Sequence, residues 1–102
     1  MVKFPEAIRE LTCLPPSDSV MARSLAANTA ESITVPAGAR YVVFAGTADF
    51  YANYTTTATV PGDTTDGTAS ELNPTMRDVR NVTTISVISG SNAVITAAFY
   101  SA

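Results

Sequence analysis

Histidine and tryptophan are absent from this 102-residue sequence, and cysteine occurs once, at Cys13. Without histidine the chain has no Ser-His-Asp or Cys-His catalytic arrangement and no zinc site that uses histidine. A lone cysteine forms no intramolecular disulfide. Cys13 lies near leucines and prolines, with no base to form its thiolate, so we interpret it as a small apolar filler. We therefore expect no enzyme activity and no bound cofactor.

Basic residues are few. Six Lys and Arg oppose nine Asp and Glu, which gives a formal net charge of −3. A nucleic-acid-binding protein normally presents a basic stripe to the phosphates, and a membrane-surface protein presents a polybasic segment. We expect neither nucleic acid nor membrane as a partner. The sequence also lacks the apolar segments of a signal peptide or a membrane span, so we expect synthesis in the cytoplasm.

Large apolar side chains are scarce as well. The hydrophobic fraction is an ordinary 46%, but the chain has 16 alanines and 15 threonines and only four leucines. Small side chains bury little area, at about 25 cal/mol per Å², so the core of one such domain is only marginally stabilising. This composition favours a homo-oligomer or a subunit docked on a larger assembly.

What the sequence does contain is a series of short β-prone runs separated by turn residues. The runs cover residues 33–35, 41–44, 50–54, 84–88 and 93–100. This spacing predicts an all-β fold, either an antiparallel β-sandwich or a jelly-roll-like barrel. We assign residues 19–102 to this domain and residues 1–18 to a short N-terminal arm or helix.

Individual elements follow from local patterns. Residues 19–28 are expected to form a first strand, with a helical turn as the weaker alternative, and residues 29–35 a second strand. Gly38 suits the positive-φ position of a tight turn. The nearly continuous apolar run at residues 40–45 predicts a central strand buried on both faces, and residues 50–57 alternate as a half-buried strand.

The last third of the chain yields three further expectations. Residues 76–80 are expected to form a brief helical turn. Residues 81–89 and 93–100 resemble the two strands of an antiparallel hairpin. In the second of them Phe99 is the expected core anchor.

The N-terminal segment holds three candidate contact residues, Phe4, Ile8 and Leu11. The segment is too short to be a stable helix by itself. It either packs on its own sandwich or lies as an arm on a neighbouring subunit.

Residues 55–76 form the longest stretch without clear periodicity, and a loop of this length is more often functional than not. It contains Asp63, Asp66 and Glu71, which are weak candidates for calcium ligands because hard cations prefer carboxylate oxygens. The spacing lacks the EF-hand pattern. We favour the alternative that Asp and Thr side chains hydrogen-bond the backbone of the loop itself.

Three further residues are candidates for an interface. Asn73 precedes a proline and is interpreted as a structural corner or as part of a contact surface. Tyr51 and Tyr54 lie on opposite faces of one predicted strand, so at most one belongs to the core. The other is available for a partner or a sugar, because tyrosine is enriched at interfaces.

Several of these stretches together resemble small virion proteins of tailed bacteriophages, over residues 31–100. The likeness is carried by Thr34-Val35-Pro36-Ala37-Gly38-Ala39 and by residues 44–50, 66–74 and 83–88. The resemblance implies a sandwich or jelly-roll-like domain that decorates capsids or joins other virion parts. It implies no enzyme activity.

The sequence thus predicts a virion structural protein, either a capsid decoration protein or a minor capsid protein. Its expected partners are the major capsid protein and further copies of itself, and its expected location is the virion. A head–tail connector or tail component is the nearest alternative. A glycan- or ligand-binding β-module is an alternative of another class.

Overall fold

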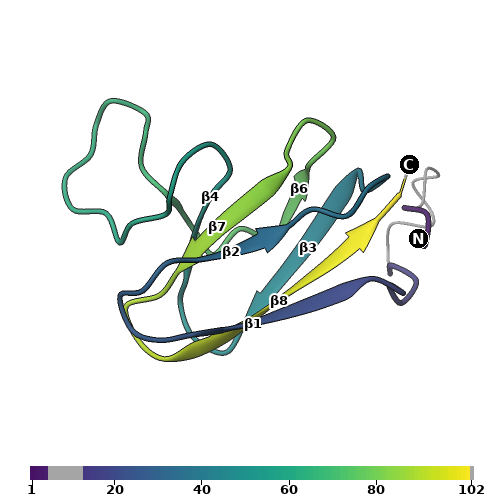
Figure 1. Cartoon of the computed structure of the whole chain (residues 1–102), viewed down its shortest axis with the longest axis horizontal. Helices are drawn as coiled ribbons and strands as arrows, with labels where there is room; N and C mark the ends of the chain where they lie inside the picture. The colour runs from purple at the N-terminus through teal and green to yellow at the C-terminus, as the bar shows by residue number, and fades with distance from the viewer. Residues whose placement is uncertain (5–12, 102) are drawn as a thin grey trace.

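The computed structural model describes residues 1–4 and 13–101, and within these ranges the chain is all-β with no helix. Eight strands follow one another along the chain (Figure 1). They are β1 (Val20–Leu25), β2 (Glu31–Thr34), β3 (Tyr41–Gly46), β4 (Tyr51–Asn53), β5 (Glu71–Leu72), β6 (Met76–Asp78), β7 (Thr84–Ile88) and β8 (Ala93–Tyr100). No helix long and apolar enough to span a membrane occurs in the described residues.

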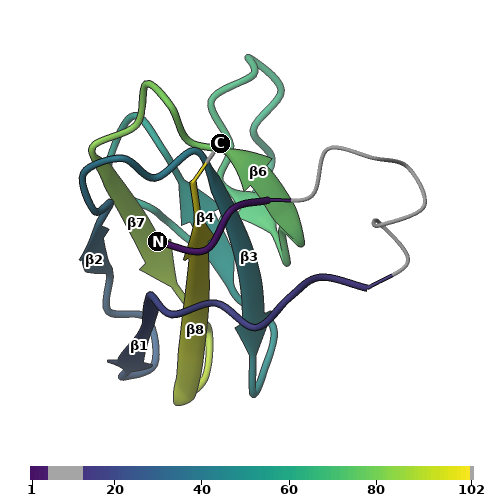
Figure 2. The same ribbon diagram turned by 90° about the vertical axis from the view of Figure 1, so that its right-hand side faces the viewer.

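The strands form two four-stranded antiparallel sheets packed face to face, in the orders β1-β8-β3-β6 and β2-β7-β4-β5 (Figure 2). The pairing is nested, because β1 pairs with β8, β2 with β7, β3 with β6 and β4 with β5. A long antiparallel ribbon wound into two sheets in this way is a jelly roll. The all-β prediction is confirmed, and the two packed antiparallel sheets are consistent with a β-sandwich.

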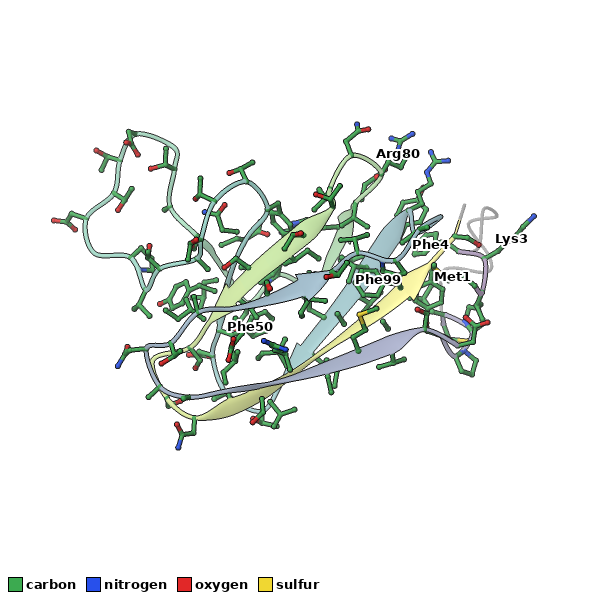
Figure 3. The ribbon with its side chains drawn as sticks, viewed as in Figure 1. Met1, Lys3, Phe4, Phe50, Arg80 and Phe99 are labelled. Atoms are coloured by element: carbon green, nitrogen blue, oxygen red, sulfur yellow. The ribbon has the colours of Figure 1, made fainter. Side chains whose placement is uncertain are left out.

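The core lies between the two sheets. The side chains of each strand point alternately to its two faces, and this alternation decides which of them enter the core. In β8, Ala93, Ile95, Ala97 and Phe99 are all buried. Phe99 is fully buried, as predicted, and Figure 3 shows it between the layers. The predicted strands over residues 19–28 and 29–35 are confirmed as β1 and β2, and Gly38 has the expected positive φ of 85°.

Two ion pairs join the sheets at their edges. At one edge Arg23 of β1 contacts Glu31 of β2 at 2.9 Å, and at the other Arg77 of β6 contacts Glu71 of β5 at 2.6 Å. Each of these four residues lies directly opposite a buried residue of the neighbouring strand. Their side chains therefore point inward, into the openings between the two sheets. Inward-pointing charges on edge strands also discourage edge-to-edge aggregation.

The predicted hairpin near the C-terminus is wrong. β7 pairs with β2 and β4, whereas β8 pairs with β1 and β3, so residues 89–92 connect different sheets. Ser89 fixes this crossing, because its buried hydroxyl donates to the carbonyl oxygen of Asp49 at 2.7 Å. Turn residues predict that the chain reverses direction, but they do not determine which strands pair.

The helical turn predicted at residues 76–80 is also wrong. Met76–Asp78 is strand β6, paired in register with Tyr41, Val42 and Val43 of β3. All three residues of β6 are exposed, so the strand has no alternation of its own. Pairing with β3 therefore decides its conformation.

Three further expectations need correction. Strand β3 is not buried on both faces, because Val42 and Phe44 are buried while Ala45 is exposed. The strand expected at residues 50–57 ends at Asn53. Cys13 is exposed and is not a core filler.

The described N-terminal residues pack on their own sandwich. The Phe4 amide donates to the Ser101 carbonyl and the Ser101 amide donates to the Val2 carbonyl, both at 2.9 Å. Farther along, the Tyr100 hydroxyl donates to the Pro15 carbonyl at 2.7 Å. Both termini lie at one end of the sandwich, opposite the long loop between β4 and β5 (Figure 1). Ile8 and Leu11 fall outside the described residues.

Candidate functional site

The outer face of the β1-β8-β3-β6 sheet consists mainly of small apolar side chains. Because Ile95, Ala97 and Phe99 are buried between the sheets, the residues that alternate with them on β8 face outward, and the register extends this to the neighbouring strands. We use the term apolar face for these outward residues: Val20, Ala22, Val43, Ala45, Met76, Val94 and Ala98.

The strand register aligns these side chains in rows. One row crosses all four strands through Val20, Ala98, Val43 and Met76. A second row holds Ala22, Thr96 and Ala45. The exposed fractions are 55% for Val20, 41% for Val94 and 39% for Met76, so the largest side chains of the face are open to solvent.

One end of this sheet face is covered by the chain itself. The centre of the Phe4 ring, labelled in Figure 3, lies 4.4 Å from the centre of the Tyr41 ring, and Tyr100 is 4% exposed. On the outer face of the described strands of this sheet, the charged residue is Asp78, which lies at this rim and pairs with Arg80 at 3.0 Å. Antiparallel sheets commonly carry polar residues on an outer face, so two uncharged, largely apolar rows indicate a contact surface.

The size of the apolar face limits how tightly a single contact holds. Strands lie about 4.8 Å apart and alternate residues about 6.8 Å apart, so the seven residues of the apolar face cover roughly 230 Å². A standard stable interface takes about 800 Å² from each partner. One copy of this face therefore supports a weak contact, and tight attachment requires several copies acting together.

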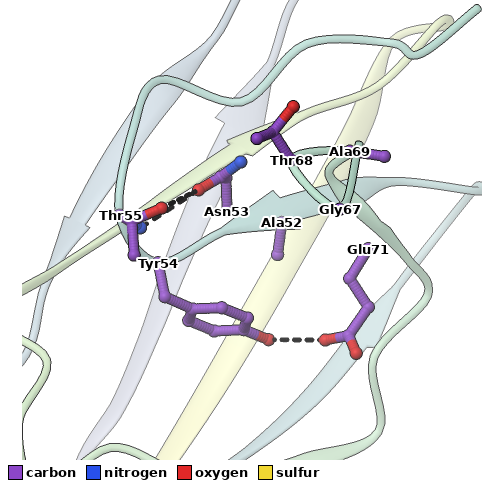
Figure 4. A pocket seen from close by; sticks show the side chains of 8 residues that line it. All are labelled: Ala52, Asn53, Tyr54, Thr55, Gly67, Thr68, Ala69 and Glu71. Carbon is purple, nitrogen blue, oxygen red and sulfur yellow. Dashed lines mark hydrogen bonds between the residues drawn. The ribbon is translucent and has the colours of Figure 1, made fainter. Parts of the chain in front are cut away.

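A second feature is a hydrogen-bonded group at the β5–β6 edge. The Tyr54 hydroxyl donates to Glu71 at 3.0 Å, and the Arg77 guanidinium donates to the same carboxylate at 2.6 Å. The bond from Arg77, supported by Tyr54, holds the pKa of Glu71 below its usual range although partial burial opposes the shift. Burial and the bond to Glu71 raise the pKa of the Tyr54 hydroxyl. Figure 4 shows the Tyr54–Glu71 bond beside a cleft of about 250 Å³.

This group predicts an acid-sensitive part of the folding free energy. Because the pKa of Glu71 is lowered in the folded state, its stabilisation is present above the unfolded-state pKa and is lost as the pH falls through the folded-state pKa. The Glu71 side chain is 37% exposed, so solvent screening limits the effect to less than about 1 kcal/mol.

Urea unfolding at pH 3 and pH 7 measures this effect. The wild-type chain should lose more stability on acidification than Glu71→Gln does. Asp63→Asn, which removes an exposed loop carboxylate, is the matched control and should keep the wild-type pH dependence. An equal pH dependence in Glu71→Gln and the wild type would contradict the role of this carboxylate.

The three calcium candidates do not form a cluster. The Asp66 carboxylate accepts hydrogen bonds from the Thr68 hydroxyl at 2.7 Å and from the Thr68 amide at 3.1 Å, which lowers the pKa of Asp66. Glu71 is engaged by Tyr54 and Arg77. Within the described ranges, no group of three acidic or cysteine side chains is placed to hold a metal ion. The bonds of Asp66 are those of an Asx-turn, the alternative favoured from the sequence.

Asn73 forms a corner between two strands. It has a φ of 46°, a region that Asn tolerates better than most residues. Its amide N–H donates to the Phe50 carbonyl at 2.8 Å, its side-chain oxygen accepts from the Phe50 amide at 3.0 Å, and its side-chain nitrogen donates to Asp49 at 2.9 Å. The side chain of Asn73 therefore already serves a structural role.

The remaining candidate contact residues lie apart from one another. Phe4 packs at the covered end of the β1-β8-β3-β6 sheet. Tyr51 belongs to the other sheet, in a row between Ile88 and Leu72. The candidates chosen from the sequence, Phe4, Ile8, Leu11, Tyr51, Tyr54 and Asn73, do not include the residues of the apolar face. The sequence does contain a signal for the apolar face. Valine and alanine occupy alternate positions of residues 93–100, where a strand facing water would carry polar side chains.

Comparison of the chain with protein-family models, with curated proteins and with solved structures gives no match.

Proposed function

We propose that this chain is a structural subunit of a bacteriophage virion, a capsid decoration or minor capsid protein that attaches to the shell through its apolar face. The observation that carries the proposal is this face, with two uncharged rows across the β1-β8-β3-β6 sheet. Apolar surface that remains uncovered in the monomer is stabilised when a partner removes it from water. The proposed partners are the major capsid protein and further copies of this chain.

Two further properties support an assembly role. The face is less than about a third of the size of a standard interface, which suits a subunit held at many equivalent positions on a symmetric lattice. The jelly roll is among the architectures used by viral capsid domains, although a fold alone does not determine function. The sequence resemblance to phage virion proteins agrees with both properties.

Immunogold electron microscopy tests the proposal. An antibody against the chain would be applied to phage particles purified from the bacterial culture in which the gene is expressed. Even labelling over the shell is the expected result. Labelling confined to one vertex or to the tail would replace the capsid role with that of a connector or tail component. A particle fraction without the chain, while the cell lysate contains it, would overturn the proposal.

A further inference from the structure

The opposite side of the molecule has a different chemistry. A cleft of about 370 Å³ lies over the outer face of the β2-β7-β4-β5 sheet, and every described residue that lines it carries a hydroxyl group. Serine and threonine come from β2, from β7 and its preceding turn, and from residues 55–57 of the long loop, and Tyr54 completes the lining. The cleft has no charged side chain among these residues. Its volume lies at the lower end of the range of about 300–1,000 Å³ for small-molecule sites.

The floor of the cleft is built by strand register. Ser32 of β2 lies opposite Ser86 of β7, and Thr34 lies opposite Thr84 in the same pair of strands. Because Ile33 and Ile85 between them are buried, these four hydroxyl side chains share the outer face, and three of them, Ser32, Thr84 and Ser86, line the cleft. Regular β-pairing therefore sets the spacing of the floor.

The wall of the cleft is held by hydrogen bonds. The Asn53 side-chain oxygen accepts from the Thr55 and Thr56 amides, both at 3.0 Å, which fixes the first turn after β4. The Ala58 amide then donates to the Ser86 hydroxyl at 2.8 Å, which holds the loop against the sheet. A wall fixed in this way does not have to be ordered when a ligand binds.

Tyr54 contributes to the lining of the cleft and is partly buried against the core. Its hydroxyl is bound to Glu71 at 3.0 Å, so the orientation of its ring is set by the β5–β6 edge (Figure 4). Tyr54 is also among the residues that line the neighbouring cleft of about 250 Å³. Tyr54 thus contributes to the lining of both clefts.

We propose that this hydroxyl-lined cleft binds an uncharged glycan. Serine and threonine hydroxyls both donate and accept hydrogen bonds, which matches a ligand that presents many hydroxyl groups of its own. The lack of charge in the lining disfavours phosphate, carboxylate or ammonium ligands, since a buried unpaired charge is costly.

This inference goes beyond the proposed function and does not depend on it. The cleft and the apolar face lie on opposite sheets of the sandwich. A subunit attached through the apolar face would therefore present the cleft away from its attachment. Failure of glycan binding would not contradict the proposed assembly role, and failure of assembly would not contradict glycan binding.

The test is a titration of the full chain, followed by amide chemical shifts in nuclear magnetic resonance. The probes are neutral gluco-, galacto- and manno-disaccharides at millimolar concentrations, with a sialylated trisaccharide as the charged comparison. We expect at least one neutral sugar to shift the amides of residues 54–57 and 83–86, and the charged sugar to bind more weakly. Absence of shifts with every neutral sugar, or shifts confined to other residues, would overturn the proposal.

A matched pair of variants makes the test specific. Thr84→Val removes one hydroxyl from the cleft at nearly constant shape, and we expect it to weaken binding about five- to tenfold, as for one lost hydrogen bond. Thr34→Val makes the same change on the cross-strand neighbour, which does not line the cleft, and should bind like the wild type. Equal affinities for Thr84→Val and the wild type would also overturn the proposal.

Discussion

The variant Val43→Asp is expected to fold normally and to lose attachment to the particle by at least about 100-fold. Val43 lies in the middle of the apolar face, between Ala98 and Met76 in the row that crosses the sheet. An aspartate there would be taken from water on docking without a partner of opposite charge. Leaving a buried charge unpaired costs about 3–5 kcal/mol, and each 1.4 kcal/mol changes an equilibrium constant tenfold.

Quantitative mass spectrometry of purified particles measures the outcome, as copies of the chain per particle relative to the wild type. Circular dichroism and urea unfolding of the isolated chain establish that the variant is folded. Light scattering over a concentration series shows whether self-association is lost together with attachment.

Two variants separate the charge from other effects. Val43→Thr keeps the branched shape without a charge, so it should reduce attachment only slightly. Thr34→Asp introduces the same charge on the outer face of the other sheet and should leave attachment unchanged. A folded Val43→Asp protein that is incorporated at the wild-type copy number would exclude the apolar face as the attachment surface.

The variant Phe99→Ala is expected to lose about 3–5 kcal/mol of unfolding free energy. Phe99 is fully buried and lies opposite Val42, which is also fully buried. Truncating a buried Phe to Ala removes apolar contacts and leaves a cavity. Domains of this size have a total unfolding free energy of about 5–15 kcal/mol, so the loss is a large part of it. A loss of this size should lower the melting temperature by at least about 12 °C.

Thermal and urea unfolding measure the loss, and the same strand offers the control. Val94 points outward from β8 and is 41% exposed, so Val94→Ala should cost less than about 1 kcal/mol. Similar losses for Phe99→Ala and Val94→Ala would contradict the assignment of the two faces of β8.

Some of the fold could be predicted from the sequence because the relevant signal is local. Alternation of apolar residues identified β8 and its buried face, including Phe99, since side chains of a strand point to opposite faces in turn. Gly38 marked a turn because only glycine adopts a positive φ freely. The Asx-turn at Asp66 was foreseen for the same kind of reason, because the bond to Thr68 spans two residues.

The sequence indicated only some of the residues that form the two candidate functional surfaces. Tyr54 was selected as an interface or sugar-contacting residue, and it lines the hydroxyl-lined cleft. The threonines around that cleft come from segments about 30 residues apart, and strand pairing brings them together. The apolar face was missed because its central row joins β1, β8, β3 and β6, which are distant along the chain.

The sequence by itself determined that this protein is an all-β domain with small core side chains, and it set which residues of its long strands face inward. These properties depend on backbone propensity and on a two-residue period, which neighbouring residues carry. Only the tertiary structure decided that β7 and β8 belong to different sheets, that residues 76–78 form a strand and that, among the described residues, one sheet presents an exposed apolar face. Each of these depends on pairing between distant segments, and the free energy of that pairing comes from burial and hydrogen bonds that no local stretch contains.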